Sequence, residues 1–226
     1  MNSALLPVKE IFSSIQGEGL YAGCRQIFIR VDGCNLACAY CDERQKPLSG
    51  NYPQNKLLKE ALRIEKTCGP HHSVSLTGGE PLVYADFLCG FLPALKKHGF
   101  TVYLETNGTL PVNLKKILGY VDIISMDIKL PSSTKGASLW KEHRGFLSAA
   151  KGKDLFVKVV VNRDTKERDV KKASLLVKKA GRGRIPFIIQ PVYGFDGYGH
   201  FADIACRHLK KDVRIIPQLH KFLSLR

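Results

Sequence analysis

The sequence predicts an α/β protein whose sheet is mostly parallel, curved and open. Short runs rich in β-branched residues alternate with stretches of helical periodicity, which is typical of repeated β/α units. The 226 residues, 44% of them hydrophobic, suffice to bury one large core. Six or seven units joined by right-handed crossovers favour a partial barrel over a complete eight-unit barrel. We expect one domain over residues 1–226, because no repeat or low-complexity linker interrupts the pattern.

The first strand is expected over residues 26–31, and a loop that contains three closely spaced cysteines follows it. Later strands, each short and rich in Val, Ile or aromatic residues, are expected over 74–77, 101–105, 123–127, 155–161, 186–190 and 213–216. Helices are expected over 54–67, 84–98, 112–118, 137–150, 166–180 and 201–209. Because helices alternate with strands in this order, the strands are predicted to run parallel.

Three cysteines, Cys34, Cys38 and Cys41, stand together in the run CNLACAYCDE with C-x3-C-x2-C spacing. Three thiolates this close can hold a four-iron cluster and leave one iron free to bind a ligand that is not protein. Structural zinc is the alternative reading. Zinc takes four nitrogen or sulfur ligands, however, and no second pair follows at finger spacing. The spacing therefore favours an iron–sulfur cluster.

Polar side chains recur where the expected strands end: Glu80, Glu105, Asp127, Lys129 and Gln190. In parallel α/β folds the carboxyl ends of the strands line one open face, where ligands bind. The cysteine loop follows the first expected strand and so belongs to that face. We therefore predict one site assembled from distant segments.

For each of these residues, a purely structural role is the alternative to ligand binding. The two glycines of TGGEP allow a ligand to approach the backbone closely, and Glu80 can accept hydrogen bonds from an ammonium group. Two glycines followed by a proline are, however, also common in turns that have no ligand. Glu105 can bind ribose hydroxyls, or it can be a solvated residue beside an Asn-Gly turn. Asp127 and Lys129, two residues apart, fall on one side of an extended strand, where a local ion pair is the alternative.

The protein is strongly basic, with a formal net charge of +15. Lys and Arg are spread along the chain, and no interleaved aromatic motif indicates a base-stacking platform, so nucleic acid is not the expected partner. A solvated basic face explains the charge more simply. A basic surface would also steer an acidic electron carrier of the flavodoxin or ferredoxin type to a redox cluster.

The seven cysteines, an odd number, and the absence of a signal-peptide pattern favour a reducing cytoplasm in which thiols stay free. The longest apolar runs fall far short of the roughly 18 residues that a membrane span needs. We therefore expect a soluble, cytoplasmic protein with no membrane partner.

The chain resembles the radical S-adenosylmethionine enzymes through its cysteine loop, its GGEP turn and its order of strands. Within them it resembles the 7-carboxy-7-deazaguanine synthases of the queuosine pathway, over most of its length. The front segment IFSSIQGEG is the most specific part, because many radical enzymes share the cysteine loop and few share FSSIQGEG ahead of it. The narrower resemblance rests on residues 11–19, 28–30, 33–36, 105–109, 190–192 and 217–221.

The resemblance implies a 4Fe–4S cluster on Cys34, Cys38 and Cys41, with the amine and carboxylate of S-adenosylmethionine on the fourth iron. It also implies that Gly79 and Glu80 hold the methionine end of that molecule. Further implied contacts to S-adenosylmethionine are Tyr40, Asp42, Glu105, Asp127, Lys129, Gln190, Pro191 and Val192.

The implied substrate is 6-carboxy-5,6,7,8-tetrahydropterin, whose ring contracts with loss of ammonia to 7-carboxy-7-deazaguanine. Arg30 suits the substrate carboxylate because its planar guanidinium offers two parallel donors. The terminal carboxylate of Arg226 is implied to reach the same pocket, as the short tail of the family can. The other implied substrate contacts are Ile15, Gln16, Gly17 and Thr77.

Two positions depart from the pattern of that family. Glu43 stands where the family usually has Thr or Ser, whose hydroxyl can bind Mg²⁺ beside the substrate. A carboxylate is also a good ligand for this ion, so Mg²⁺ on Glu43 stays an expectation, with displacement of the ion or a different substrate as the alternatives. At the second position, Asp127-Ile128-Lys129 stands where the family often has Ser-Pro-Lys, and it resembles the corresponding sequence of activating enzymes that install glycyl radicals.

Two other functions therefore stand beside the ring-contracting lyase. One is a glycyl-radical activating enzyme that acts on a protein partner. The other is a basic, zinc-bearing RNA-binding module, which would be colourless where a cluster protein is brown. The resemblance also implies a homodimer.

Overall fold

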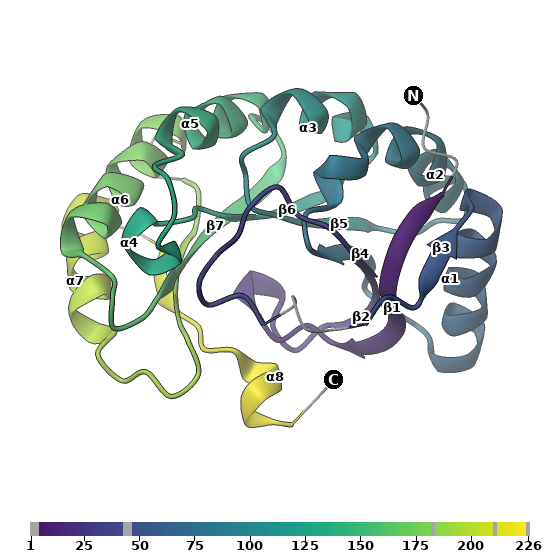
Figure 1. The fold of residues 1–226 in the computed structure, drawn as a ribbon, viewed down its shortest axis with the longest axis horizontal. Helices are drawn as coiled ribbons and strands as arrows, with labels where there is room; N and C mark the ends of the chain where they lie inside the picture. Colours follow the sequence, from purple (N-terminus) through teal and green to yellow (C-terminus); the bar gives the residue numbers. More distant parts are fainter. Residues whose placement is uncertain (1–4, 43–46, 182–183, 210–211, 225–226) are drawn as a thin grey trace.

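The computed structural model describes residues 5–42, 47–181, 184–209 and 212–224, and these form a curved, open sheet wrapped by helices (Figure 1). The nine strands found in this part of the chain follow the order β3-β1-β2-β4-β5-β6-β7-β8-β9. From β2 to β9 neighbouring strands are parallel, while β1 pairs antiparallel with both β2 and β3. The sheet does not close, because β3 and β9 are its two edges.

The strands are β1 (Leu6–Ile15), β2 (Arg25–Val31), β3 (Gly50–Tyr52), β4 (Ser73–Gly78), β5 (Val102–Thr106), β6 (Ile123–Asp127), β7 (Asp154–Val161), β8 (Phe187–Pro191) and β9 (Val213–Ile215). The α-helices are α1 (Gln54–Cys68), α2 (Ala85–Lys97), α3 (Pro111–Ile117), α4 (Pro131–Thr134), α5 (Trp140–Ala149), α6 (Glu167–Gly181), α7 (Gly199–Leu209) and α8 (Leu219–Phe222). Short 3₁₀ turns are η1 (Gly19–Tyr21), η2 (Pro81–Tyr84) and η3 (Leu118–Tyr120).

The predicted α/β class and open parallel sheet are confirmed, and each predicted strand and helix lies within a few residues of an observed one. One part of the prediction was wrong, because the cysteine loop follows β2 and not the first strand of the chain. β1 escaped the sequence analysis since a bulge between Val8 and Glu10 breaks its alternation and several of its side chains are polar. β2 is nevertheless the first strand of the parallel part of the sheet.

Side chains on the two faces of the sheet differ in kind. On β7, Val157 and Val159 are fully buried under the helices, and each stabilises the fold by roughly 1.5–3 kcal/mol. Lys158 lies between them in sequence and therefore points to the opposite, concave face. The same alternation on the other parallel strands gives an apolar convex face and a polar concave face.

The amino end of the concave face is closed by a small aromatic cluster. Tyr103, Phe156 and Ile188 pack there with Tyr21 from η1, whose ring meets that of Tyr103 edge-on at 5.7 Å. The concave face is therefore filled at the amino ends of its strands, and any cavity opens at their carboxyl ends.

The helices on the convex side explain part of the charge of the chain. In α6, Val170, Ala173 and Val177 are buried at helical spacing, while Lys171 and Lys178 lie on the exposed side. These lysines are solvated surface residues, as the simpler reading of the net charge predicts. Among the described residues, no helix is long and apolar enough to cross a membrane.

Candidate active site

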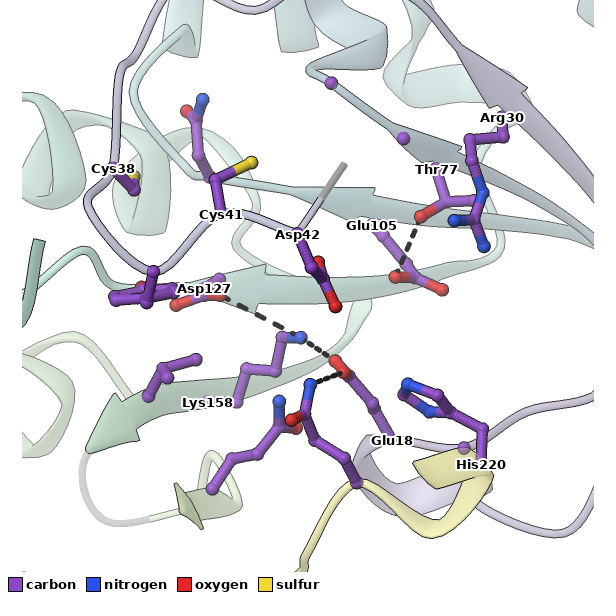
Figure 2. A pocket seen from close by; sticks show the side chains of 18 of the residues that line it. Glu18, Arg30, Cys38, Cys41, Asp42, Thr77, Glu105, Asp127, Lys158 and His220 are labelled. Carbon is purple, nitrogen blue, oxygen red and sulfur yellow. Dashed lines mark hydrogen bonds and ion pairs between the residues drawn. The ribbon is translucent and has the colours of Figure 1, made fainter. Parts of the chain in front are cut away.

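A cavity of about 740 Å³ opens at the carboxyl ends of the parallel strands (Figure 2). Its walls come from β1, β2, the cysteine loop, the ends of β4 to β8 and the C-terminal segment around α8. Segments from the start, middle and end of the chain thus meet at one place. This is the single assembled site that the strand-end pattern predicts.

All three clustered cysteines, Cys34, Cys38 and Cys41, line the cavity. Hydrogen bonds shape their loop, since Ala39 N donates to the Thr134 carbonyl at 2.9 Å and Cys41 N donates to the Cys38 carbonyl at 3.2 Å. Within the described residues, no three potential ligands are already gathered around one point. Burial raises the pKa of both Cys34 and Cys38, so without a metal these thiols keep their protons at neutral pH.

The donor set nevertheless fits an iron–sulfur cluster. Leu36 N lies 3.4 Å and Asn107 Nδ2 lies 3.9 Å from Cys34 Sγ, and both are hydrogen-bond donors. N–H groups directed at a sulfur stabilise a thiolate ligand. Cys34, Cys38 and Cys41 are therefore the residues that would hold the cluster.

One wall contains residues predicted to contact S-adenosylmethionine. Lys129 Nζ lies 2.8 Å from Asp127 Oδ2 and 3.4 Å from the Tyr40 hydroxyl, and it stands 5.4 Å above the Tyr40 ring. Burial alone would lower the pKa of Lys129, but the negative groups around it, led by Asp127, raise it well above its ordinary value. The local ion pair named as the alternative is therefore present, and it faces the cavity.

Two buried oxygens on this wall have no hydrogen-bond partner in the described part of the chain: Asp127 Oδ1 and Gln190 Oε1. Both residues line the cavity, and their side chains are almost completely buried. A buried acceptor without a donor costs free energy, so the pair suits the hydroxyls or amine of a bound nucleoside. Val192 lines the same wall, whereas Pro191 does not reach the lining.

The GGEP turn supports the site from behind. Glu80 is fully buried and its carboxylate accepts hydrogen bonds from Leu82 N, Thr106 Oγ1 and Asn107 N. Desolvation raises the pKa of Glu80 to about 7 despite these donors. Gly79 lines the cavity and Glu80 does not, so the visible role of Glu80 is to join the turn after β4 to the turn after β5.

The opposite wall contains the residues predicted to contact a pterin, and Ile15, Gln16, Gly17, Arg30 and Thr77 all line it. Arg30 Nε lies 3.3 Å from Glu10 Oε2, and the guanidinium lies 5.4 Å from the centre of the Phe12 ring. The guanidinium is thus placed against an aromatic face with an edge directed to the cavity (Figure 2).

Glu105 is predicted to contact the ribose of S-adenosylmethionine, but its hydrogen bonds place it beside residues of the wall predicted to contact the pterin. It accepts hydrogen bonds from Gln16 Nε2 at 2.9 Å, Ser75 Oγ at 3.1 Å and Thr77 Oγ1 at 3.0 Å. Two of these donors, Gln16 and Thr77, are residues predicted to bind the substrate. The carboxylate therefore holds Gln16 and Thr77 in place at the floor of the cavity.

Sequence reasoning missed an ion cluster at the centre of the floor. The Lys158 ammonium contacts Glu18 Oε2 and lies 3.8 Å from Asp127 Oδ2, as Figure 2 shows. These three side chains are 9%, 18% and 8% exposed, which makes the cluster nearly dry. A single lysine within the apolar run LFVKVVV was the available signal, and Glu18 lies within the front segment of the resemblance.

Sequence reasoning counted residues 217–221 in the resemblance but gave no site role to Gln218, His220 or Lys221. Leu219 N donates to the Gly17 carbonyl at 2.8 Å, Gln218 Nε2 donates to Glu18 Oε1 at 3.0 Å, and Lys221 Nζ lies 2.9 Å from Asp42 Oδ2. These contacts bring α8 across the mouth of the cavity, with His220 directed inward (Figure 2). Of the remaining predicted residues, Asp42 lines the cavity, while Glu43 and Arg226 lie outside the described residues.

Comparison with known proteins identifies the class to which this fold and site belong. The family described as the radical SAM superfamily matches residues 28–197, which is more than half of the chain. The chain therefore belongs to the radical SAM superfamily. Membership implies a 4Fe–4S cluster and S-adenosylmethionine as cofactors, in agreement with the cysteine loop and the unpartnered acceptors of the cavity.

Relatives that cover nearly the whole chain narrow the assignment. A protein of Geobacter sulfurreducens named 7-carboxy-7-deazaguanine synthase is 39% identical over an alignment of 245 positions, which covers 96% of each chain. One of the same name from Methanothermobacter thermautotrophicus is 35% identical and covers 97% of this chain and 98% of its own. The crystal structure of QueE from Escherichia coli shares the fold, with a TM-score of 0.69 at 23% identity over 96% of both chains. Within the superfamily, the chain belongs to the 7-carboxy-7-deazaguanine synthase family.

Proposed function

We propose that this protein converts 6-carboxy-5,6,7,8-tetrahydropterin to 7-carboxy-7-deazaguanine with loss of ammonia, as the lyase of a deazapurine or queuosine pathway. One observation supports the proposal above all. The cavity has the cysteine loop on one side and Arg30, Gln16 and Thr77 on the other, so that a cofactor half and a carboxylate-binding half share one space. Family membership agrees with this division, since the related proteins are named for that product.

On the cofactor side, Cys34, Cys38 and Cys41 would hold the cluster. When bound and reduced by one electron, the cluster and S-adenosylmethionine supply a 5′-deoxyadenosyl radical that abstracts hydrogen. The backbone at Gly79 would receive the methionine end. The unpartnered oxygens of Asp127 and Gln190 would accept hydrogen bonds from the nucleoside and so help to position it in the cavity.

The further contacts to S-adenosylmethionine that are proposed from the resemblance differ in how much of the cavity they reach. They are Tyr40, Asp42, Glu80, Glu105, Lys129, Pro191 and Val192. Tyr40 and Lys129 form one unit through their contact at 3.4 Å. Glu80 and Pro191 would act through their neighbours, because neither lines the cavity.

On the substrate side, Arg30 would bind the substrate carboxylate with its planar fork. The aromatic faces of Phe12 and Phe28, stacked 5.2 Å apart, lie beside it and line the cavity. Ile15, Gln16, Gly17, Thr77 and the terminus at Arg226 are the other proposed contacts. The C-terminal segment at the mouth excludes water from the reacting atoms.

Mg²⁺ beside the substrate carboxylate, with Glu43 as ligand, is part of the proposal. Glu43 follows Asp42 in the sequence, and Asp42 lines the cavity. A carboxylate is a hard oxygen ligand that suits Mg²⁺. Turnover should therefore depend on added Mg²⁺, and turnover that is unchanged after chelation would remove the ion from the proposal.

We further propose that the protein acts as a one-domain homodimer in the cytoplasm and receives electrons from an acidic flavodoxin or ferredoxin. The net charge of +15 supports an acidic donor, because opposite charges speed the encounter of redox partners. Reduction by such a donor should slow steeply with added salt, and a rate indifferent to salt would count against it. Light scattering at several protein concentrations tests the dimer.

The decisive experiment is an anaerobic assay of the iron-loaded protein with S-adenosylmethionine, reductant, Mg²⁺ and the pterin. Mass spectrometry should find 5′-deoxyadenosine and 7-carboxy-7-deazaguanine together. Deoxyadenosine without the deazaguanine would keep the radical chemistry and overturn the substrate. Arg30→Ala should keep the iron content and raise the KM for the pterin, and unchanged kinetics would remove Arg30 from the pocket.

A further inference from the structure

Asn107, in the turn after β5, is held by all of its polar groups although the mechanism above gives it no task. The residue is 5% exposed. Its backbone N–H donates to Glu80 Oε2 at 2.7 Å, and its side-chain Oδ1 accepts from Thr109 N at 3.1 Å and from Thr109 Oγ1 at 2.6 Å. Because two donors meet Oδ1, the amide orientation is determined and Nδ2 must point the other way.

Nδ2 points at the cysteine loop. It lies 2.9 Å from Asn35 Oδ1 and 3.9 Å from Cys34 Sγ. Asn35 in turn donates from Nδ2 to Thr109 Oγ1 at 2.9 Å. The cysteine loop and the turn after β5 are therefore joined by a closed network, and that network places one N–H donor beside the sulfur of Cys34.

A third element supports the turn from behind. His143, on α5, has a fully buried ring, and its Nε2 lies 3.2 Å from the Asn107 carbonyl oxygen. Burial lowers the pKa of His143 to about 4, so the ring is neutral at physiological pH. Its Nε2 lies between the Asn107 carbonyl and Lys129 N, 3.4 Å away, and the tautomer determines whether it donates to the first or accepts from the second. Glu80 on one side and His143 on the other thus flank the backbone of Asn107.

We infer that Asn107 is a positioning residue for the iron–sulfur cluster, whose side-chain amide donates a hydrogen bond to the Cys34 sulfur and thereby raises the reduction potential of the cluster. The inference rests on the proposed function only in so far as the cysteines hold a cluster. The reduced cluster carries one more negative charge than the oxidised cluster. A donor beside a ligating sulfur therefore stabilises the reduced form more, as hydrogen bonds to cluster sulfurs do.

The test is a redox titration of the reconstituted protein without S-adenosylmethionine or substrate, followed by electron paramagnetic resonance. Asn107→Leu removes the donor to Cys34 without adding charge and should shift the midpoint in the same direction as the second variant. That variant, Asn107→Asp, keeps an oxygen to accept from Thr109, removes the donor and adds a negative charge. At a fixed potential near the midpoint, its ratio of reduced to oxidised cluster should fall about tenfold, which is 59 mV for one electron. Thr109→Val is the matched control, because it disturbs the same turn and leaves Nδ2 beside Cys34.

The inference is overturned if the leucine or the aspartate variant holds a full cluster with the wild-type midpoint, or if the valine control shifts the midpoint as far. A measurement on the wild type makes the test independent of how the variants fold. In protein labelled with ¹⁵N only in asparagine, pulsed double resonance of the reduced cluster should detect a coupled side-chain nitrogen, and its absence would also overturn the inference. A protein that binds no iron would instead refute the proposed function.

Discussion

Lys158→Met should destabilise the protein in a pH-dependent way, because Lys158 is the cation that keeps a buried carboxylate charged. Its ammonium contacts Glu18 and lies 3.8 Å from Asp127, and the three side chains are 9%, 18% and 8% exposed. Removing one partner of a buried ion pair costs roughly 3–5 kcal/mol, since the remaining charge is left without compensation. We expect a loss of this order in the free energy of unfolding at neutral pH.

Glu18 determines the sign of the pH dependence. Burial alone would raise the pKa of Glu18, but the charge and hydrogen bond of Lys158, with a hydrogen bond from Gln218, lower it from 4.5 to about 2. A carboxyl with a lowered pKa in the folded state stabilises the protein above pH 4.5 and loses this contribution as the pH falls toward 2. A shift of this size corresponds to about 3 kcal/mol, which agrees with the cost of breaking the pair.

Without the lysine, burial is the largest remaining effect, opposed only by the weaker hydrogen bond from Gln218 and the charge of His220, so the pKa of Glu18 in the variant rises above its unfolded value. The folded variant then takes up a proton as the pH falls, and its stability should increase between about pH 8 and about pH 5.5. In the wild type the same carboxyl stays ionised over this range and contributes no slope. The cost of the substitution should therefore shrink on acidification.

The measurement is urea unfolding of the cluster-free proteins, followed by far-ultraviolet circular dichroism at both pH values. Lys116→Met is the matched control, since Lys116 pairs with Asp86 at 2.7 Å on the surface, where both side chains are more than two fifths exposed. The control substitution should lower the free energy of unfolding much less at either pH. Adding Glu18→Gln to the Lys158 variant should recover part of the loss. A Lys158 variant as stable as the control, or equally damaged at both pH values, would refute the reasoning.

Two further predictions concern the cavity. Cys38→Ala should remove the iron and the visible absorbance, whereas Cys89→Ala, outside the cluster loop, should keep both; iron retained in the first variant would refute the ligand assignment. Gly17→Ala should lower kcat/KM roughly 10- to 100-fold with full iron content, because the new methyl group would overlap His220 and displace the C-terminal segment. Gly119→Ala, where a methyl group meets nothing within 4 Å, is its control, and equal kinetics in the two variants would contradict the proposed contact.

Much of the fold could be predicted from the sequence because central parallel strands such as β6, β7 and β8 are buried on both faces. Runs such as residues 155–161 are almost continuously apolar, and the helices between them have clear periodicity. β1 and β3 could not be predicted in this way. β1 pairs antiparallel near the sheet edge and has several polar side chains, while β3 has only three residues. Such strands depend on tertiary contacts more than on local pattern.

The site could be predicted where chain order and strand ends determine it. The cysteine loop and the residues at the ends of β4, β5, β6 and β8 meet because parallel strands end on one side of a sheet. Lys158 does not lie at a strand end, and the C-terminal segment reaches the cavity through contacts with Gly17 and Asp42 that no local spacing encodes. These residues can be assigned to the site only when the strand register and the path of the C-terminal segment are known from the structure.

The register of the sheet also places one buried cation between distant segments. Asp127 on β6 is paired in register with Lys158 on β7, so the lysine stands beside the acid that faces the cofactor wall. Its other partner, Glu18, follows β1 and is held by Gln218 from the C-terminal segment. One buried cation thus links the carboxylate at the end of β6 to the carboxylate that follows β1. Because a buried charge left without a partner is costly, this cluster favours keeping the end of β6, the middle of β7 and the segment after β1 together.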